Sequence, residues 1–214
     1  MKKLKQVDKS HYQFSKYINK RRWISIWHQL DEVISLNPKS VLEVGKGSGL
    51  FQIISANIGI AVETVDIDPE LNPDHVASAT ELPFDDNTYE CVCAFQVLEH
   101  LPYEQAIKAF GEMVRVAKNY IIISLPDAKP LILFYVSLPK IGKRFFQMPI
   151  PRVISRTHKY DGEHYWEINK RGYPLRKIIN DFISNEAKLL NTYRIKEYPR
   201  HRYFVIKKTT KCEF

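Results

Sequence analysis

The 214-residue sequence has few cysteines and no long apolar run. Its three cysteines are Cys91 and Cys93, inside an apolar stretch, and Cys212 near the end. This sparse, odd set offers neither a disulfide framework nor the spacing of a metal site, so we predict a reducing, cytoplasmic compartment. No stretch of about 20 apolar residues occurs, which excludes a membrane-spanning helix. Residues 1–9 are basic without an apolar segment behind them, which argues against a secretory signal.

Acidic residues are in the minority. There are 24 of them against 32 lysines and arginines, and the net charge is +8. The basic excess gathers at the N-terminus, around 140–144 and in the C-terminal third. A solvated surface explains this balance, and so would contact with nucleic acid, phospholipid or an anionic substrate. No nucleic-acid-binding module is visible, so we favour a small-molecule partner and keep peripheral lipid contact open.

Hydrophobic periodicity predicts an alternation of strands and helices. Apolar residues three to four apart over 12–36 predict an amphipathic helix that Asn37-Pro38 ends. Short apolar runs, each followed by a turn and a helical pattern, then repeat, which predicts a parallel α/β sheet with helices on both faces. We expect strands in 40–44, 60–68, 91–97, 120–126, 187–198 and 201–208, and helices over 50–58, 103–117 and 173–184.

The stretch "VLEVGKGSGL", Val41 to Leu50, predicts a ligand-binding turn. Glycines after a parallel strand let the backbone approach a ligand closely, and the following helix offers unpaired N–H groups. The dinucleotide fingerprint G-x-G-x-x-G would need glycine at position 50, where this sequence has leucine. Glu43, just before the turn, would repel a pyrophosphate and attract an amino group. The turn therefore disfavours NAD.

Asp66 lies 21 residues after Gly45, at the end of the next expected strand. Neighbouring parallel strands end side by side, at the crevice where such sheets bind ligands. A carboxylate at this position can accept hydrogen bonds from both hydroxyls of a ribose. Together with Glu43, it predicts a site for a nucleoside that carries an amino-acid-like, positively charged end.

Four motifs in order carry a family resemblance. They are E-x-G-x-G-x-G at 43–49, "VDIDPEL" at 65–71, "ATELPFDDNTYECV" at 79–92 and "LEHL" at 98–101. Over about 38–126 the chain resembles the type-11 branch of class I S-adenosylmethionine-dependent methyltransferases. The resemblance implies a Rossmann-like fold: a seven-stranded, mostly parallel sheet with helices on both faces and the last strand inserted antiparallel. It also implies S-adenosylmethionine as cofactor.

The resemblance assigns cofactor roles to individual positions. The glycine turn lies against the methionine part, Asp66 holds the ribose, and Ile67 packs on the adenine. Ser78 stands where relatives have an acid facing the adenine amine, a departure that removes a charge, and Gln96 falls near the methionine carboxylate or the methyl. The implied cofactor-binding residues are Glu43, Gly45, Gly47, Gly49, Asp66, Ile67, Ser78, Ala79 and Gln96.

Acceptor residues are expected after the fourth and fifth strands. His100 in "LEHL" and His164 in "HKYDGEHYWEI" are candidate bases, needed only if the acceptor loses a proton. The second stretch is dense in polar and aromatic residues, and in relatives the segment after the fifth strand shapes the acceptor pocket. We predict that Tyr165 and Trp166 contact the acceptor; a loop anchored on the core is the alternative. His158, Asp161 and His164 lack a fourth partner for a metal, so we predict no metal site.

We predict one domain, 1–214, in four parts. A helical cap spans 1–37, the cofactor-binding half 38–126, an acceptor-side insertion 127–170, and a C-terminal helix with strands 171–214. The insertion contains "LILFYVSLPKIGKRFFQMP", which we expect to form short helices folded over the sheet as a lid, because Pro139 interrupts any long helix. An interfacial helix on lipid is the alternative.

The predicted function is transfer of a methyl group from S-adenosylmethionine to an unidentified acceptor by direct in-line displacement. Three rivals stay open. The first is an NAD- or nucleotide-sugar-dependent enzyme of similar architecture, which Leu50 and Glu43 disfavour. The second is a non-catalytic protein that binds S-adenosylmethionine or a nucleotide on the same fold. The third is an RNA-directed methyltransferase.

Overall fold

The computed structural model describes residues 9–12, 17–140, 142–150, 157–183 and 186–209. Its centre is a seven-stranded sheet in the order β3-β2-β1-β4-β5-β9-β8. The first five strands of this order pair in parallel, and β9 pairs antiparallel with both β5 and β8. The fold prediction is confirmed, including the inserted last strand. The bounds are β1 Ser40–Val44, β2 Ala61–Asp66, β3 His75–Val76, β4 Tyr89–Phe95, β5 Ala117–Pro126, β8 Ala187–Arg194 and β9 His201–Lys208.

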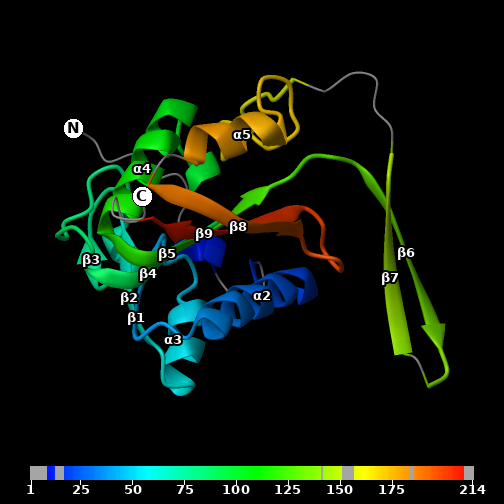
Figure 1. Cartoon of the computed structure of the whole chain (residues 1–214), viewed down its shortest axis with the longest axis horizontal. Helices are drawn as coiled ribbons and strands as arrows, with labels where there is room; N and C mark the ends of the chain where they lie inside the picture. The colour runs from blue at the N-terminus through cyan, green and yellow to red at the C-terminus, as the bar shows by residue number, and fades with distance from the viewer. Residues whose placement is uncertain (1–8, 13–16, 141, 151–156, 184–185, 210–214) are drawn as a thin grey trace.

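Helices cover both faces of the sheet (Figure 1). Helices α2 (Lys20–Leu36) and α3 (Leu50–Asn57) lie on one face, and α4 (Tyr103–Val116) and α5 (Leu175–Phe182) lie on the other. Each face has its own core, because a strand covered on both sides buries successive residues alternately. In β4, Val92 belongs to the core under α4, whereas Cys91 and Cys93 belong to the core under α2 and α3. Both cysteines are free thiols.

The first long helix begins later than predicted. The periodic pattern suggested a helix from residue 12, but α2 starts at Lys20, and Lys9–Tyr12 forms a short 3-10 helix, η1. The start is fixed by Asn19, whose side chain accepts hydrogen bonds from the backbone N–H groups of Arg21 and Arg22. The end is where it was expected, at Asn37 in the left-handed conformation (φ 47°) before Pro38.

The prediction of short lid helices after β5 is wrong. This segment is an antiparallel hairpin of β6 (Leu131–Leu138) and β7 (Gly142–Pro149) that projects away from the body of the molecule (Figure 1). Its sequence is rich in β-branched and aromatic residues, which favour strands. Pro139 does break the segment, but at the turn of a hairpin, where Lys140 and Gly142 have positive φ. None of the helices in the described ranges has the length and apolar composition needed to span a membrane.

Candidate active site

A cavity of about 1050 Å³ opens at the carboxyl ends of the parallel strands. This is the edge at which open α/β sheets bind ligands, because the loops after the strands diverge there. Residues that follow β1, β2, β4 and β5 line it, together with parts of the N-terminal segment and of the β8–β9 connection. Of the residues assigned to the cofactor, the wall includes Gly45, Gly47, Asp66, Ile67, Ser78, Ala79 and Gln96; Glu43 and Gly49 are not part of it.

The glycine turn after β1 requires glycine at its first position. Gly45 has φ 86°, and a Cβ atom built on it would lie 2.5 Å from Cγ2 of Val97. Its N–H donates to the Val65 carbonyl at 2.8 Å, which ties the turn to β2. Gly47 also has positive φ (52°) and faces the ring of Tyr12. The turn therefore keeps bare backbone at the cavity.

Asp66 and the glycine turn are joined by a hydrogen bond. The Asp66 carboxylate accepts the backbone N–H of Lys46 at 2.9 Å through Oδ2 and that of Asp68 at 3.0 Å through Oδ1. Burial raises the pKa of Asp66, although these backbone donors act in the opposite direction. Gly47 N–H also lies close enough to stabilise the charged carboxylate. A carboxylate has about four acceptor positions, so these three backbone donors leave capacity for a ribose hydroxyl in the cavity.

Glu43 lies beneath the turn as a buried acid with an unsatisfied oxygen. Its Oε2 has no hydrogen-bond partner among the described residues. Burial raises the pKa of this carboxyl well above its usual range, the nearby Lys46 opposes the rise, and Asp66 adds to it. The Lys46 ammonium itself donates to the Asn72 carbonyl at 2.6 Å. An unsatisfied acid next to the cavity would be stabilised by an incoming ammonium group.

Ser78 and Gln96 line the cavity with part of their polar groups already engaged. The Ser78 hydroxyl lies 2.8 Å from the Thr80 hydroxyl within a local turn. Gln96 has a positive φ of 58°, its N–H donates to the Ser124 carbonyl, and its side-chain amide donates to the Ser124 hydroxyl at 3.2 Å. Gln96 is thus fixed at the end of β4 by β5, and its side-chain oxygen still has acceptor capacity.

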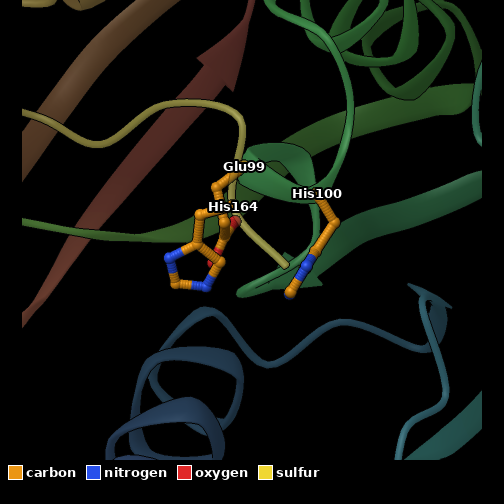
Figure 2. A group of neighbouring side chains, drawn as sticks. All are labelled: Glu99, His100 and His164. Carbon is orange, nitrogen blue, oxygen red and sulfur yellow. The ribbon is translucent and has the colours of Figure 1, made fainter. Parts of the chain in front are cut away.

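His100 and His164 meet in the cavity wall, although 64 residues separate them in sequence. Figure 2 shows them converging with Glu99; their ring centroids are 5.0 Å apart. Glu99 and His100 belong to the 3-10 helix η3 (Leu98–His100). Two contacts attach the His164 segment to it: Tyr165 N–H donates to the Glu99 carbonyl at 2.9 Å, and His100 Nδ1 lies 3.0 Å from the Glu163 carbonyl.

The environment shifts the ionisation of these groups in different directions. Burial, reinforced by His164, lowers the pKa of His100. Burial alone would also lower the pKa of His164, but its hydrogen bond to Glu167 and the charges of Glu99 and Asp161 raise it instead. Burial raises the pKa of Glu99 to about 7, against the opposing charge of His164. The buried Glu99 carboxyl thus lies close to both imidazoles.

Tyr165 and Trp166 do not line the cavity, contrary to the prediction. Trp166 is fully buried in the core under α4, and its indole N–H donates to the Leu101 carbonyl at 3.1 Å. Tyr165 is partly exposed and packs on Tyr160, with ring centroids 4.8 Å apart. Trp166 instead anchors its loop on the core, which was the alternative prediction. At this residue, the high density of aromatic side chains reflects packing. Only His164 of this stretch's assigned residues reaches the cavity wall.

Other residues of the wall carry no sequence motif. Tyr12 and Tyr17 lie edge to face with ring centroids 5.0 Å apart, and the guanidinium of Arg22 lies 4.2 Å from the centroid of Tyr17. Asp127, after β5, is buried and forms ion pairs with Arg194 and Arg202. The periodic apolar pattern that includes both tyrosines predicted only a helix face, so composition alone could not assign them to a site.

Part of the chain resembles a known family of domains. Residues 42–123 match the family model described as a methyltransferase domain. The matched range begins in β1, ends in β5 and includes the glycine turn, Asp66 and Gln96. The comparison with curated proteins gave no match.

Solved structures agree in fold. A 1,6-didemethyltoxoflavin-N1-methyltransferase from Burkholderia thailandensis has a TM-score of 0.61 at 13% identity, covering 94% of this chain and 85% of that one. A magnesium protoporphyrin IX methyltransferase from Synechocystis PCC 6803 has a TM-score of 0.53 at 17% identity, covering 88% of this chain and 80% of that one. The [4+2]-cyclase SpnF has a TM-score of 0.55 at 13% identity, covering 89% of this chain and 81% of that one. The chain thus shares the Rossmann-like fold of these solved structures, and its residues 42–123 match the methyltransferase-domain model.

Proposed function

We propose that the protein binds S-adenosylmethionine in this cavity and transfers its methyl group to a small molecule. The observation that carries the proposal is the hydrogen bond between Lys46 N–H and Asp66 Oδ2, which places bare glycine backbone and a carboxylate on one wall. The nucleoside then lies toward Asp66 and Ile67, and the amino-acid end lies toward the glycine turn, above Glu43. His100 and His164 face the remaining space, where the acceptor enters.

The reaction needs little machinery beyond alignment. A lone pair on the acceptor forms a bond to the methyl carbon, and the bond between that carbon and sulfur breaks. Its electron pair stays on sulfur, so the sulfonium becomes the neutral thioether of S-adenosylhomocysteine. The proton on the acceptor atom leaves to water or to an imidazole. Because the methyl group is already activated, holding the two reactants in line supplies most of the rate.

The acceptor class rests on the shape of the site. The cavity has a volume of about 1050 Å³, and Tyr12, Tyr17 and His164 are among the residues that line it. A cavity of this kind, with aromatic rings among its lining residues, suits a compact organic acceptor. Two structural neighbours are named for such reactions, the toxoflavin precursor and magnesium protoporphyrin methyltransferases.

The proposal is tested by release of S-adenosylhomocysteine. The purified chain is incubated with S-adenosylmethionine and, separately, with the small-molecule, RNA and protein fractions of a cell extract. We expect product with the small-molecule fraction and none with Asp66→Ala. Product with the RNA fraction alone would replace the small acceptor by RNA. Cofactor binding without product in any fraction would favour a binding protein.

A non-catalytic or differently catalytic use of the fold is the second candidate. One structural neighbour with this fold is named as a [4+2]-cyclase and not as a methyltransferase. In the present chain, Ser78 replaces the expected acid, and its hydroxyl is engaged with Thr80. This reading predicts that Asp66→Ala abolishes cofactor binding while leaving the biological function intact.

A further inference from the structure

We propose that Glu99, His100 and His164 bind a divalent transition-metal cation at the acceptor side of the cavity. One potential ligand atom from each of these three residues lies within 4.8 Å of the other two (Figure 2). Two imidazoles and a carboxylate form a ligand set that suits such ions. Bonds of about 2.1 Å to a shared ion would draw these atoms closer together.

The strongest indication is the state of the Glu99 side chain. Glu99 is completely buried, and neither of its carboxylate oxygens has a hydrogen-bond partner in the described part of the chain. Leaving a buried carboxylate without partners is costly, and native proteins rarely do it without a purpose. A cation between Glu99 and the two imidazoles would satisfy this group.

Both histidines have an acceptor group close to Nδ1. A ligating imidazole commonly donates its other ring N–H to a carbonyl or carboxylate, which fixes its tautomer. His100 Nδ1 lies 3.0 Å from the Glu163 carbonyl, and His164 Nδ1 lies 3.2 Å from Oε1 of Glu167. When Nδ1 carries the proton in each ring, Nε2 carries the lone pair that binds a metal.

A second cluster shares His164 but is less suited to a cation. Asp161, His164 and Glu167 also bring potential ligand atoms within 4.8 Å of one another. Asp161, however, already accepts the backbone N–H groups of Glu163 and His164, and Glu167 pairs with His164 and Lys170. These carboxylates are satisfied without an ion, so Asp161 serves as the matched control.

The position of the cluster indicates which acceptors it serves, and this step rests on the proposed function. His100 and His164 line the cavity, so coordination positions not filled by protein would face the space where the acceptor lies. A divalent cation holds oxygen ligands and lowers the pKa of a coordinated hydroxyl. The geometry points to an acceptor that presents a hydroxyl or similar oxygen to the methyl group.

The test is a titration of the chelator-treated full chain with Co²⁺, followed by visible absorption, with Zn²⁺ as competitor. We expect one ion per chain, at least tenfold weaker binding by Glu99→Gln and by His164→Gln, and unchanged binding by Asp161→Asn. No binding by the unaltered chain, equal binding by Glu99→Gln, or loss in Asp161→Asn would each overturn the site.

Two parallel measurements separate this proposal from the methyltransferase proposal. S-adenosylmethionine binding should be the same in Glu99→Gln and in the unaltered chain, because Asp66 and the glycine turn are intact. Thermal unfolding without metal shows whether each variant is folded. Cofactor binding without cation binding overturns the metal site alone, whereas cation binding without cofactor binding overturns the methyltransferase alone.

We also infer, from independent observations, that the β6–β7 hairpin docks on an anionic lipid surface. Its two strands carry large apolar side chains with exposed fractions of 37% to 64%. Seven consecutive positions of the first strand, 131–137, contain only one polar residue, so both faces of the ribbon are apolar. These exposed residues are Ile132, Phe134, Tyr135, Val136, Phe145, Phe146 and Met148, with Ile150 just after the hairpin. Leu133 is also exposed, but it lines the cavity at the base of the hairpin.

Charge decides between a lipid surface and a second copy of the chain. Residues 128–160 contain no aspartate or glutamate, and they contain seven lysines and arginines. Two such hairpins would bring like charges together, whereas anionic headgroups would attract them. An isolated two-stranded hairpin is also marginally stable in water, and burial of its apolar faces at a lipid interface would stabilise it.

Flotation with vesicles tests the inference. We expect the full chain to float with phosphatidylcholine vesicles containing phosphatidylglycerol, more weakly with pure phosphatidylcholine, and less as salt rises. Replacing the stacked pair, as Phe134→Ser with Phe146→Ser, should abolish flotation, and Lys140→Gln with Arg144→Gln should weaken it. Trp27→Ser removes an even more exposed aromatic side chain from α2 and should have no effect.

Two outcomes would overturn the lipid surface. One is the absence of flotation with either vesicle. The other is a concentration-dependent dimer, seen by sedimentation, that disappears in the double phenylalanine variant, because that result assigns the hairpin to a second copy. S-adenosylmethionine binding by the same variants confirms that the body of the molecule stays folded.

Discussion

Gly45, in the turn after β1, is a position where a side chain does not fit. Its positive φ and the 2.5 Å approach of Val97 both exclude a side chain. We expect Gly45→Ala to lower the free energy of unfolding by about 2–4 kcal/mol, from left-handed backbone strain and overpacking, and to weaken cofactor binding. Urea unfolding and cofactor titration measure the two effects.

Gly59→Ala is the control for this substitution. Gly59 has a similar φ of 84°, but nothing lies within 4 Å of an added Cβ, and Gly59 is not part of the cavity wall. Only the backbone strain, about 1 kcal/mol, should appear, with cofactor binding unchanged. Equal losses in the two variants would contradict the special role of the Val97 contact.

Substitution of Trp166 tests whether this residue belongs to the core or contacts the acceptor. Trp166→Ala should lower the free energy of unfolding by about 3–5 kcal/mol, because a fully buried indole leaves a large cavity. The same substitution should leave cofactor affinity unchanged in the fraction that remains folded. Thermal unfolding and titration at low temperature measure this. A fully stable variant that loses methyl transfer would restore the acceptor assignment.

At the scale of elements, β9 is tied to α2 through a buried polar contact. His201 Nδ1 lies 2.9 Å from the Ser25 hydroxyl, and the Tyr203 hydroxyl donates to the Ser25 carbonyl at 2.9 Å. Burial, with the positive charges of Arg22 and His164, lowers the pKa of His201 to about 3. The folded protein thus keeps this imidazole neutral, whereas the unfolded chain protonates it near its ordinary pKa of about 6.5.

The difference between the two pKa values of His201 makes the free energy of unfolding depend on pH in a defined direction. Between the folded and unfolded pKa values of His201 the unfolded state binds the extra proton, so stability rises with pH and is lost as pH falls from about 6.5 toward 3. The slope is about 1.4 kcal/mol per pH unit. Urea unfolding of the native chain and of His201→Asn at pH 7 and pH 5 should show the larger loss in the native chain. Equal losses would contradict the depressed pKa.

The elements also show where sequence reasoning succeeded and where it failed. The core strands and helices α3 to α5 were predictable because each combines a clear period with a turn residue or proline at its end. Helix α2 was placed eight residues too early because the apolar period continues before Asn19, and the cap rather than the period fixes the start. The hairpin was mistaken for helices because apolar residues on both strand faces erase the alternation that identifies a strand.

At the scale of the whole molecule, the sheet assembles the site from distant segments. The positions of Gly45, Asp66 and Gln96 at the cavity could be predicted, because these residues follow adjacent strands in known motifs. The cluster of Glu99, His100 and His164 could not, because it depends on how the segment after the hairpin returns to η3. The same is true of Tyr12 and Tyr17, which reach the cavity from a segment with no motif.

The central claim is that the glycine turn and Asp66 form an S-adenosylmethionine site. Calorimetric titration of the full chain with S-adenosylmethionine, S-adenosylhomocysteine and NAD tests it most directly, beside Asp66→Ala. We expect micromolar binding of the first two, about −8 kcal/mol, no binding of NAD, and at least a tenfold loss in Asp66→Ala. Failure to bind either form of the cofactor, or equal binding by the variant, would contradict the account.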